Sequence, residues 1–247
     1  MSNAIGESSS PRGSLRKTAH TDVEPQDIQQ SVSLRVKVSA IFTVVFSGIA
    51  LFSDGYSAAV ISNLNLLFAE IYDKTYFNST VKTRLSNAFL IGEIFGMLFF
   101  GLLIDQIGRK AGVILATTFL VLGIALSAAS EGVTPGGLFW MLIITRGLAG
   151  VGAGGEYPTC GTNATEASDE QKHTRNMRGF LIAMVGDFAI DFGFVLGGIV
   201  PLIVLACFNY SNYPAVWRTC LALGLIPPLS VIYMRIKFEL DGLKLLI

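Results

Sequence analysis

Long apolar stretches separated by short polar segments account for most of the chain after residue 34. Each stretch approaches or exceeds the ~20 apolar residues that an α-helix needs to cross the hydrocarbon core of a bilayer. The stretches are expected at 38–69, 85–104, 111–130, from about 136, at 179–207 and at 219–234. The pattern therefore predicts an all-α membrane protein with six transmembrane helices.

Polar segments at the two ends lie outside the predicted helices. Residues 1–34 are rich in serine, glutamine and charge and contain no apolar run, so we expect a disordered cytoplasmic tail. Residues 35–237 form the predicted transmembrane bundle, and 238–247 form a short, truncated cytoplasmic end. Lysine and arginine flank the first and last stretches, which places both termini in the cytoplasm by the positive-inside rule. We expect the protein in the lipid bilayer of the plasma membrane.

The composition agrees with a membrane protein and argues against several other classes of protein. Hydrophobic residues make up 51% of the 247 residues and charged residues only 15%. The formal net charge is zero and no nucleic-acid motif is present, so we expect no nucleic-acid partner. Two histidines and three scattered cysteines predict no metal site, and the lack of a nucleophile–base motif predicts that the chain is not an enzyme.

Charged residues inside the apolar stretches are the main candidates for function, because charge in a membrane interior is costly. Asp54 and Arg146 both fall near mid-depth, and we expect them to face each other across the bundle and to pair. A carboxylate that gains and loses such a partner suits proton transport. Glu93 interrupts the second stretch, where a place in a proton path and a structural role are both open.

Three further polar residues are weaker candidates. Asp187 and Asp191 lie four residues apart in the fifth stretch and hence on one helix face. They suit proton coupling or hydrogen bonds to substrate hydroxyls, and a merely hydrophilic face toward a water-filled cavity stays open. Asn78 belongs to an Asn-Ser-Thr sequon in a short outer loop, 72–84, and is a weak glycosylation candidate.

The segment RGLAGVGAGGEYP, residues 146–158, combines glycines with charge inside the fourth apolar stretch. Gly147, Gly150 and Gly154 recur three and four residues apart, which on a helix gives one face without side chains. Such a face lets a neighbouring helix approach closely. Glu156 lies about 15 Å along the helix from Arg146, toward the predicted cytoplasmic end.

Two motifs in the sequence resemble those of the major facilitator superfamily. GLLIDQIGRK, residues 101–110, fits Gly-x-x-x-Asp-x-x-Gly-Arg-Lys, the loop between its second and third helices, and RGLAGVGAGG fits Arg-x-x-x-Gly-x-Gly-x-Gly-Gly in its fourth helix. The acid-Tyr-Pro that follows resembles the phosphate:proton symporter branch, and Glu156 with Thr159-Cys160 is closer to the fungal glycerophosphoinositol (glycerophosphodiester) permeases. In the superfamily the first motif is a conformational latch between two halves, represented here by Gly101, Asp105, Gly108, Arg109 and Lys110.

The resemblance implies that residues 35–237 form the N-terminal six-helix bundle of a twelve-helix major facilitator fold. The C-terminal six-helix half is then a missing partner, and we interpret the chain as a truncated product, a gene-model fragment or a pseudogene remnant. By resemblance, Asp54, Arg146 and Glu156 have proton-coupling roles, and Tyr157 donates a hydrogen bond to the substrate phosphate. The expected energy source is the proton gradient, with no cofactor.

Two departures from the phosphate transporters bear on the substrate. The second acid of their helix-one motif is replaced by Ser57, and Val185 stands where their fifth helix has a phosphate-binding glutamine. These losses, together with the two added aspartates of the fifth stretch, predict a larger substrate with hydroxyl groups. We expect proton-coupled transport of a glycerophosphodiester such as glycerophosphoinositol. An inorganic phosphate:proton symporter and a non-transporting fragment are the alternatives.

Overall fold

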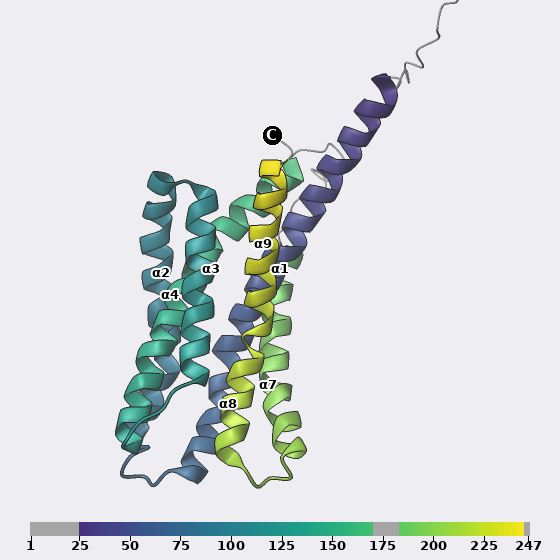
Figure 1. Cartoon of the computed structure of the whole chain (residues 1–247). Helices are drawn as coiled ribbons and strands as arrows, with labels where there is room; N and C mark the ends of the chain where they lie inside the picture. The colour runs from purple at the N-terminus through teal and green to yellow at the C-terminus, as the bar shows by residue number, and fades with distance from the viewer. Residues whose placement is uncertain (1–24, 170–182, 245–247) are drawn as a thin grey trace, which may run out of the picture. The chain divides into compact units, whose positions relative to one another are not determined.

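The computed structural model describes residues 25–169 and 183–244, with side chains described for 48–158, 183 and 186–237 apart from Asp105, Arg109 and Lys110. Every regular element in these ranges is helical (Figure 1). The elements are α1 (Pro25–Ile71), α2 (Ser79–Ile107), α3 (Arg109–Ala128), α4 (Pro135–Asp169), the π-helix η1 (Met184–Phe188), α7 (Ala189–Cys207), α8 (Tyr213–Leu223) and α9 (Ile226–Lys244). The predicted all-α fold is confirmed over the described ranges.

The chain divides into two compact units, residues 1–38 and 39–247. The larger unit contains the helices that are long and apolar enough to cross a membrane. The described residues include five such segments, Ser79–Ile104, Ala111–Ala128, Pro135–Pro158, Gly186–Cys207 and Tyr213–Lys237. The part of α1 from residue 39 onward belongs to the same unit and packs among these helices.

The N-terminal half of the chain shows two differences from the predicted boundaries. α1 begins at Pro25, so the predicted tail overlaps this helix over residues 25–34, whereas 1–24 lie outside the described residues. α2 begins at Ser79 because Asn78 caps it, the Asn78 side chain accepting a hydrogen bond from the Val81 amide at 2.9 Å. The predicted outer loop 72–84 is therefore limited to 72–78.

The later boundaries differ for equally local reasons. α4 runs to Asp169, into the start of the polar segment that follows the fourth stretch. The predicted sixth span is interrupted, since α8 ends at Leu223 and α9 begins at Ile226, with prolines 227 and 228 in its first turn. Proline is tolerated there because the first turn needs no intrahelical N–H donor. α9 then continues to Lys244, beyond the predicted end of the bundle.

Glycines on both helices allow α2 and α4 to pack closely. A Cβ atom at Gly150 would lie 2.0 Å from the Phe89 carbonyl oxygen, and one at Gly154 would lie 2.1 Å from the Glu93 carbonyl oxygen. Gly92 and Gly96 make equally close contacts from α2. The smooth face predicted on α4 is confirmed, and its partner is a second small-residue face of the same kind.

The closeness of this contact predicts different effects for two glycines on the same face. Gly154→Ala would force the two backbones apart, and we expect it to lower the free energy of unfolding by about 1–3 kcal/mol. Gly147→Ala is the matched control, because its Cβ would lie 3.7 Å from the nearest atom, in ordinary van der Waals contact. Unfolding in mixed micelles, followed by circular dichroism, measures both variants, and equal losses would contradict the close contact at Gly154.

Close contacts at glycine residues also join α1 to α7. A Cβ atom at Gly55 would lie 2.1 Å from the Ile190 carbonyl oxygen, and one at Gly193 would lie 2.2 Å from the Phe52 carbonyl oxygen. Gly55 immediately follows Asp54, so this contact fixes the part of α1 that carries the buried carboxylate.

An aromatic cluster fills the bundle near the 72–78 loop. The ring of Phe68 lies 5.8 Å from Phe77, 5.6 Å from Phe139 and 5.6 Å from Trp217, in each case edge to face. Trp217 is only 1% exposed. These contacts join α1, α4 and α8 at one end of the bundle. Edge-to-face aromatic pairs stabilise the packing beyond the effect of burying their large apolar area.

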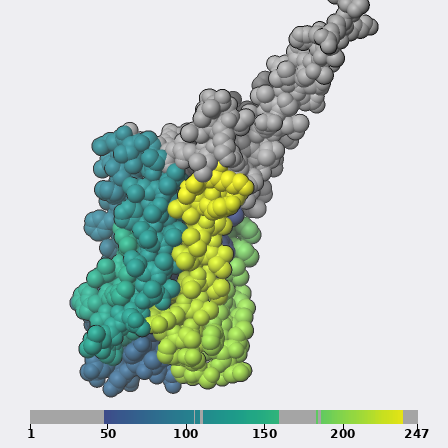
Figure 2. All heavy atoms as spheres, viewed as in Figure 1, coloured from purple at the N-terminus to yellow at the C-terminus, as the bar shows by residue number. Residues whose placement is uncertain are grey.

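The outer surface of the larger unit is strongly apolar. Large exposed hydrophobic residues gather on α2 and α7, among them Leu98, Leu102, Leu202 and Ile203. In Figure 2 the teal surface of α3 and the yellow surface of α9 lie side by side. An apolar exterior of this kind is expected where helices face lipid or another helical domain.

Candidate functional site

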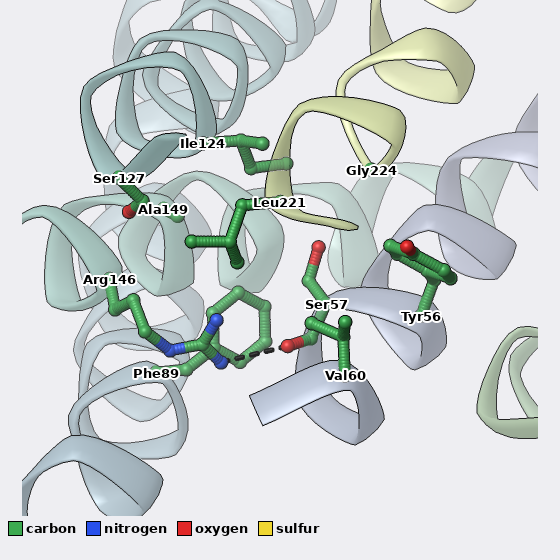
Figure 3. A pocket seen from close by; sticks show the side chains of 10 residues that line it. All are labelled: Tyr56, Ser57, Val60, Phe89, Ile124, Ser127, Arg146, Ala149, Leu221 and Gly224. Atoms are coloured by element: carbon green, nitrogen blue, oxygen red, sulfur yellow. Dashed lines mark hydrogen bonds between the residues drawn. The ribbon is translucent and has the colours of Figure 1, made fainter. Parts of the chain in front are cut away.

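Arg146 lies inside the bundle, in a small pocket formed by residues of α1, α2, α3, α4 and the α8–α9 junction (Figure 3). The residue is 3% exposed, and its Nη2 atom donates a hydrogen bond to the Ser57 carbonyl oxygen at 2.7 Å. The guanidinium also stacks on the Phe89 ring, 5.3 Å from its centroid. Its Nε atom has no hydrogen-bond partner, and no carboxylate of the described residues pairs with it.

This environment predicts that Arg146 contributes little to stability. Replacement by methionine removes one hydrogen bond from a charged group, worth about 1.5–3 kcal/mol, and one cation–π contact. It also relieves a buried charge whose cost in a membrane interior is at least ~2.5–3.5 kcal/mol. We therefore expect Arg146→Met to change the free energy of unfolding by less than ~1 kcal/mol. A loss of several kcal/mol in the same micelle titration would show that the contacts with α1 and α2 outweigh the buried charge.

Asp54 does not pair with Arg146, so the expected ion pair is corrected. Its Oδ2 atom accepts a hydrogen bond from the Tyr157 hydroxyl at 2.5 Å, and its Oδ1 atom is buried without a hydrogen-bond partner. The reason is the register of two antiparallel helices. The Arg146 side chain reaches α1 at Ser57, one turn beyond Asp54, whereas the later part of α4 brings Tyr157 to the carboxylate.

Glu93 lies near the same hydroxyl. Its carboxyl group interacts electrostatically with Tyr157 and with Asp54. Asp54 is 4% exposed, whereas Glu93 is partly exposed on α2. The structure thus brings two carboxyl groups from α1 and α2 to one phenol on α4, a grouping that the sequence pattern did not single out.

Glu156 is 1% exposed and forms a two-pronged ion pair with Arg235 of α9. The Arg235 Nη1 and Nη2 atoms donate to Glu156 Oε1 and Oε2 at 2.7 and 2.8 Å. The Thr117 hydroxyl of α3 contacts both residues and also donates to the Val113 carbonyl oxygen. Arg235 was missed as a site residue, because the sequence indicated only a positive charge at the end of a helix.

The remaining predicted residues are not tested by the structure. Asp187 lies in η1 and Asp191 in the first turn of α7, and both are exposed. π-Helical turns are frequent at functional sites, which is compatible with the predicted substrate contacts. The substrate-binding roles of both aspartates stay predictions, as does glycosylation at Asn78.

The predicted latch is described only in part. Gly108 joins α2 directly to α3 with φ of +89°, a backbone conformation that favours glycine, and Gly101 has open space around it. The side chains of Asp105, Arg109 and Lys110 lie outside the described residues. No group of three or more potential metal ligands occurs among the residues that the structure describes.

Comparison with known proteins agrees with this fold. Residues 40–240 match the family model "Sugar (and other) transporter". The chain is 42% identical over 217 residues to glycerophosphoinositol transporter 1 of Saccharomyces cerevisiae, covering 87% of this chain and 42% of that protein. It is 33% identical over 211 residues to a glycerophosphocholine permease of Candida albicans, covering 85% and 39%.

A solved structure gives the same fold. The partially occluded, inward-open xylose transporter XylE from E. coli superimposes with a TM-score of 0.64 at 20% identity, over 80% of this chain and 49% of that chain. The fold is that of a major facilitator transporter, and the protein is an integral membrane protein. The chain belongs to the sugar (and other) transporter family, and it spans about 40% of the length of the curated relatives that it matches.

Proposed function

We propose that this bundle takes part in proton-coupled transport of a glycerophosphodiester, such as glycerophosphoinositol, across the plasma membrane. Two of its relatives are named for glycerophosphoinositol and glycerophosphocholine, which share the glycerophosphodiester group. The chain acts as a carrier rather than as an enzyme, uses the proton gradient without a cofactor, and has both termini in the cytoplasm. A second six-helix half completes the pathway.

The single observation that carries the proposal is the hydrogen bond from Tyr157 to Asp54. A phenol has one hydroxyl proton, so Tyr157 cannot donate to the Asp54 carboxylate and to a substrate phosphate at the same time. Protonation of Asp54 removes its need for that donor, and Tyr157 then donates to the phosphate. Binding of the anion and binding of the proton therefore favour each other, which is the thermodynamic basis of symport.

The buried charges of the bundle support the same assignment. Arg146 supplies a positive charge without a carboxylate partner among the described residues, which offsets the negative charge of a phosphodiester. Asp54, Arg146 and Glu156 are the proposed proton-coupling residues, and Tyr157, Asp187 and Asp191 the proposed substrate-binding residues. Asp187 and Asp191, being exposed, are available to accept hydrogen bonds from inositol or glycerol hydroxyls.

Uptake into vesicles tests this function directly. The chain is reconstituted together with the second half of the Saccharomyces cerevisiae relative, supplied as a separate polypeptide, and labelled glycerophosphoinositol is added outside under an inward proton gradient. Gradient-dependent accumulation, competed by unlabelled glycerophosphocholine more strongly than by inorganic phosphate, is the expected result. Stronger competition by phosphate would assign the site to inorganic phosphate, and no uptake would contradict transport by this chain.

A further inference from the structure

We propose that Glu93, Tyr157 and Asp54 form a proton relay that joins the partly exposed side of α2 to the buried carboxyl group on α1. The inference rests on the proposed proton-coupled transport and adds to it an entry residue, Glu93, and a transferring residue, Tyr157. Each residue comes from a different helix, so the relay exists only where α1, α2 and α4 meet.

The geometry places one hydroxyl between two carboxyl groups. Tyr157 donates to Asp54 Oδ2 at 2.5 Å, and the Glu93 carboxyl interacts electrostatically with the same hydroxyl from α2, whose backbone packs against Gly154, three residues before Tyr157. A hydroxyl oxygen can accept one hydrogen bond while its proton is donated in another. The Tyr157 hydroxyl can therefore donate to one carboxyl group and accept from the other at the same time. The accessibility of the two ends differs, since Asp54 is 4% exposed and Glu93 is partly exposed.

The transfer step conserves protons and charge. Protonated Glu93 donates its proton to the Tyr157 oxygen as the Tyr157 hydroxyl proton passes to the Asp54 carboxylate. The O–H bond of Glu93 breaks, the O–H bond of Asp54 forms, and Tyr157 remains a neutral phenol throughout. Glu93 is left as a carboxylate that takes its next proton from its exposed side. After Asp54 has released its proton, rotation of the Tyr157 hydroxyl proton back toward Asp54 resets the relay.

The packing of α2 against α4 holds the relay in place. The Glu93 carbonyl oxygen lies 2.1 Å from where a Cβ atom of Gly154 would be, so the backbone of α2 approaches α4 three residues before Tyr157. A larger residue at Gly154 would move Glu93 away from the phenol. On α1, the contact of Gly55 with Ile190 fixes the neighbouring carboxylate in the same manner.

Among the residues whose side chains are described, few other charged groups act on the relay. The groups that act electrostatically on Asp54 from the packed helices are Glu93 of α2 and Glu156 of α4, and Glu156 is paired with Arg235. Arg146 points to Ser57 instead. The proton that reaches Asp54 is therefore shared chiefly between two carboxyl groups joined by one phenol.

The first test needs no transport. The full chain in lipid nanodiscs is transferred from H₂O to D₂O, and the infrared carbonyl band of protonated Asp54, identified by its loss in Asp54→Asn, is followed as it shifts on deuteration. We expect Glu93→Gln and Tyr157→Phe each to slow this shift by roughly tenfold or more, because each removes one member of the path. Glu70→Gln and Tyr76→Phe, at exposed positions, are the matched controls and should exchange like the unchanged chain.

Two results would overturn the relay. One is an unchanged exchange rate in a folded Glu93→Gln or Tyr157→Phe variant, and the other is the lack of any carboxyl band that Asp54→Asn removes between acid and neutral pH. Should one of the two variants fail to fold, the other decides. Since no substrate is added, a failure of this arm is separate from a failure of the proposed transport.

The second test uses the vesicles described above. Glu93→Gln is expected to lose accumulation driven by the proton gradient but to keep exchange of labelled for unlabelled glycerophosphoinositol at equal pH, because exchange needs no net proton movement. Normal accumulation by Glu93→Gln would also contradict the relay. If the unchanged chain shows neither activity, the proposed transport is contradicted, and the infrared result still decides the relay.

Discussion

Replacement of Arg235 by methionine is expected to lower the free energy of unfolding by about 3–5 kcal/mol, the usual cost of removing one partner from a buried ion pair. Glu156 is 1% exposed and its two carboxylate oxygens each accept a hydrogen bond from the Arg235 guanidinium. Methionine fills a similar volume but donates nothing, so the carboxylate would lose its two-pronged partner within the bundle. Unfolding in mixed micelles, followed by circular dichroism, measures the loss.

The double variant Glu156→Gln/Arg235→Met is the sharpest control for this prediction. It removes both charges together, and a neutral pair of similar volume often matches a buried ion pair in stability. We expect it to recover most of the loss seen with Arg235→Met alone. Lys237→Met, an exposed position on the same helix, should change stability by less than ~0.5 kcal/mol. Arg235→Met as stable as the unchanged chain would contradict the prediction, and a double variant no more stable than Arg235→Met would show that the loss does not come from the unpaired carboxylate.

Much of the fold follows from patterns that the sequence displays directly. The apolar stretches predict the helices, because a segment of ~20 residues that crosses the bilayer must satisfy its backbone hydrogen bonds internally. The small-residue face on α4 predicts close packing, and a Cβ atom at Gly154 would indeed lie 2.1 Å from a backbone oxygen of α2. These features depend on local spacing, so they need no knowledge of which helices are neighbours.

The contacts of the charged residues were harder to predict because they depend on the register between helices. Asp54 and Arg146 both lie near mid-depth, yet the Arg146 side chain reaches α1 at Ser57. Asp54 instead accepts a hydrogen bond from Tyr157. A shift of one helical turn decides between these partners, and the sequence does not specify it. Arg235, 79 residues beyond Glu156, reaches its partner from α9, which begins after the break that follows α8.

Asp54→Asn is expected to reduce gradient-driven accumulation of glycerophosphoinositol by about a hundredfold, a typical cost of removing a group that transfers a proton. Asparagine has nearly the same shape, and its amide oxygen can still accept the hydrogen bond from Tyr157, so we expect the fold to persist. The amide cannot take up a proton under these conditions. Uptake into vesicles under an inward proton gradient measures the loss, and Asp73→Asn, at an exposed position, is the matched control.

Exchange at equal pH separates proton coupling from substrate binding in this variant. The asparagine resembles the protonated carboxyl group in charge, so Tyr157 is expected to donate to the phosphate as it does in the protonated protein. Asp54→Asn should therefore retain exchange of labelled for unlabelled substrate while losing accumulation. Loss of both would make Asp54 part of the binding surface or of the fold. Retention of both exchange and accumulation would assign the role of proton carrier to Glu156 or Glu93, since these are the carboxyl groups that couple electrostatically to Asp54.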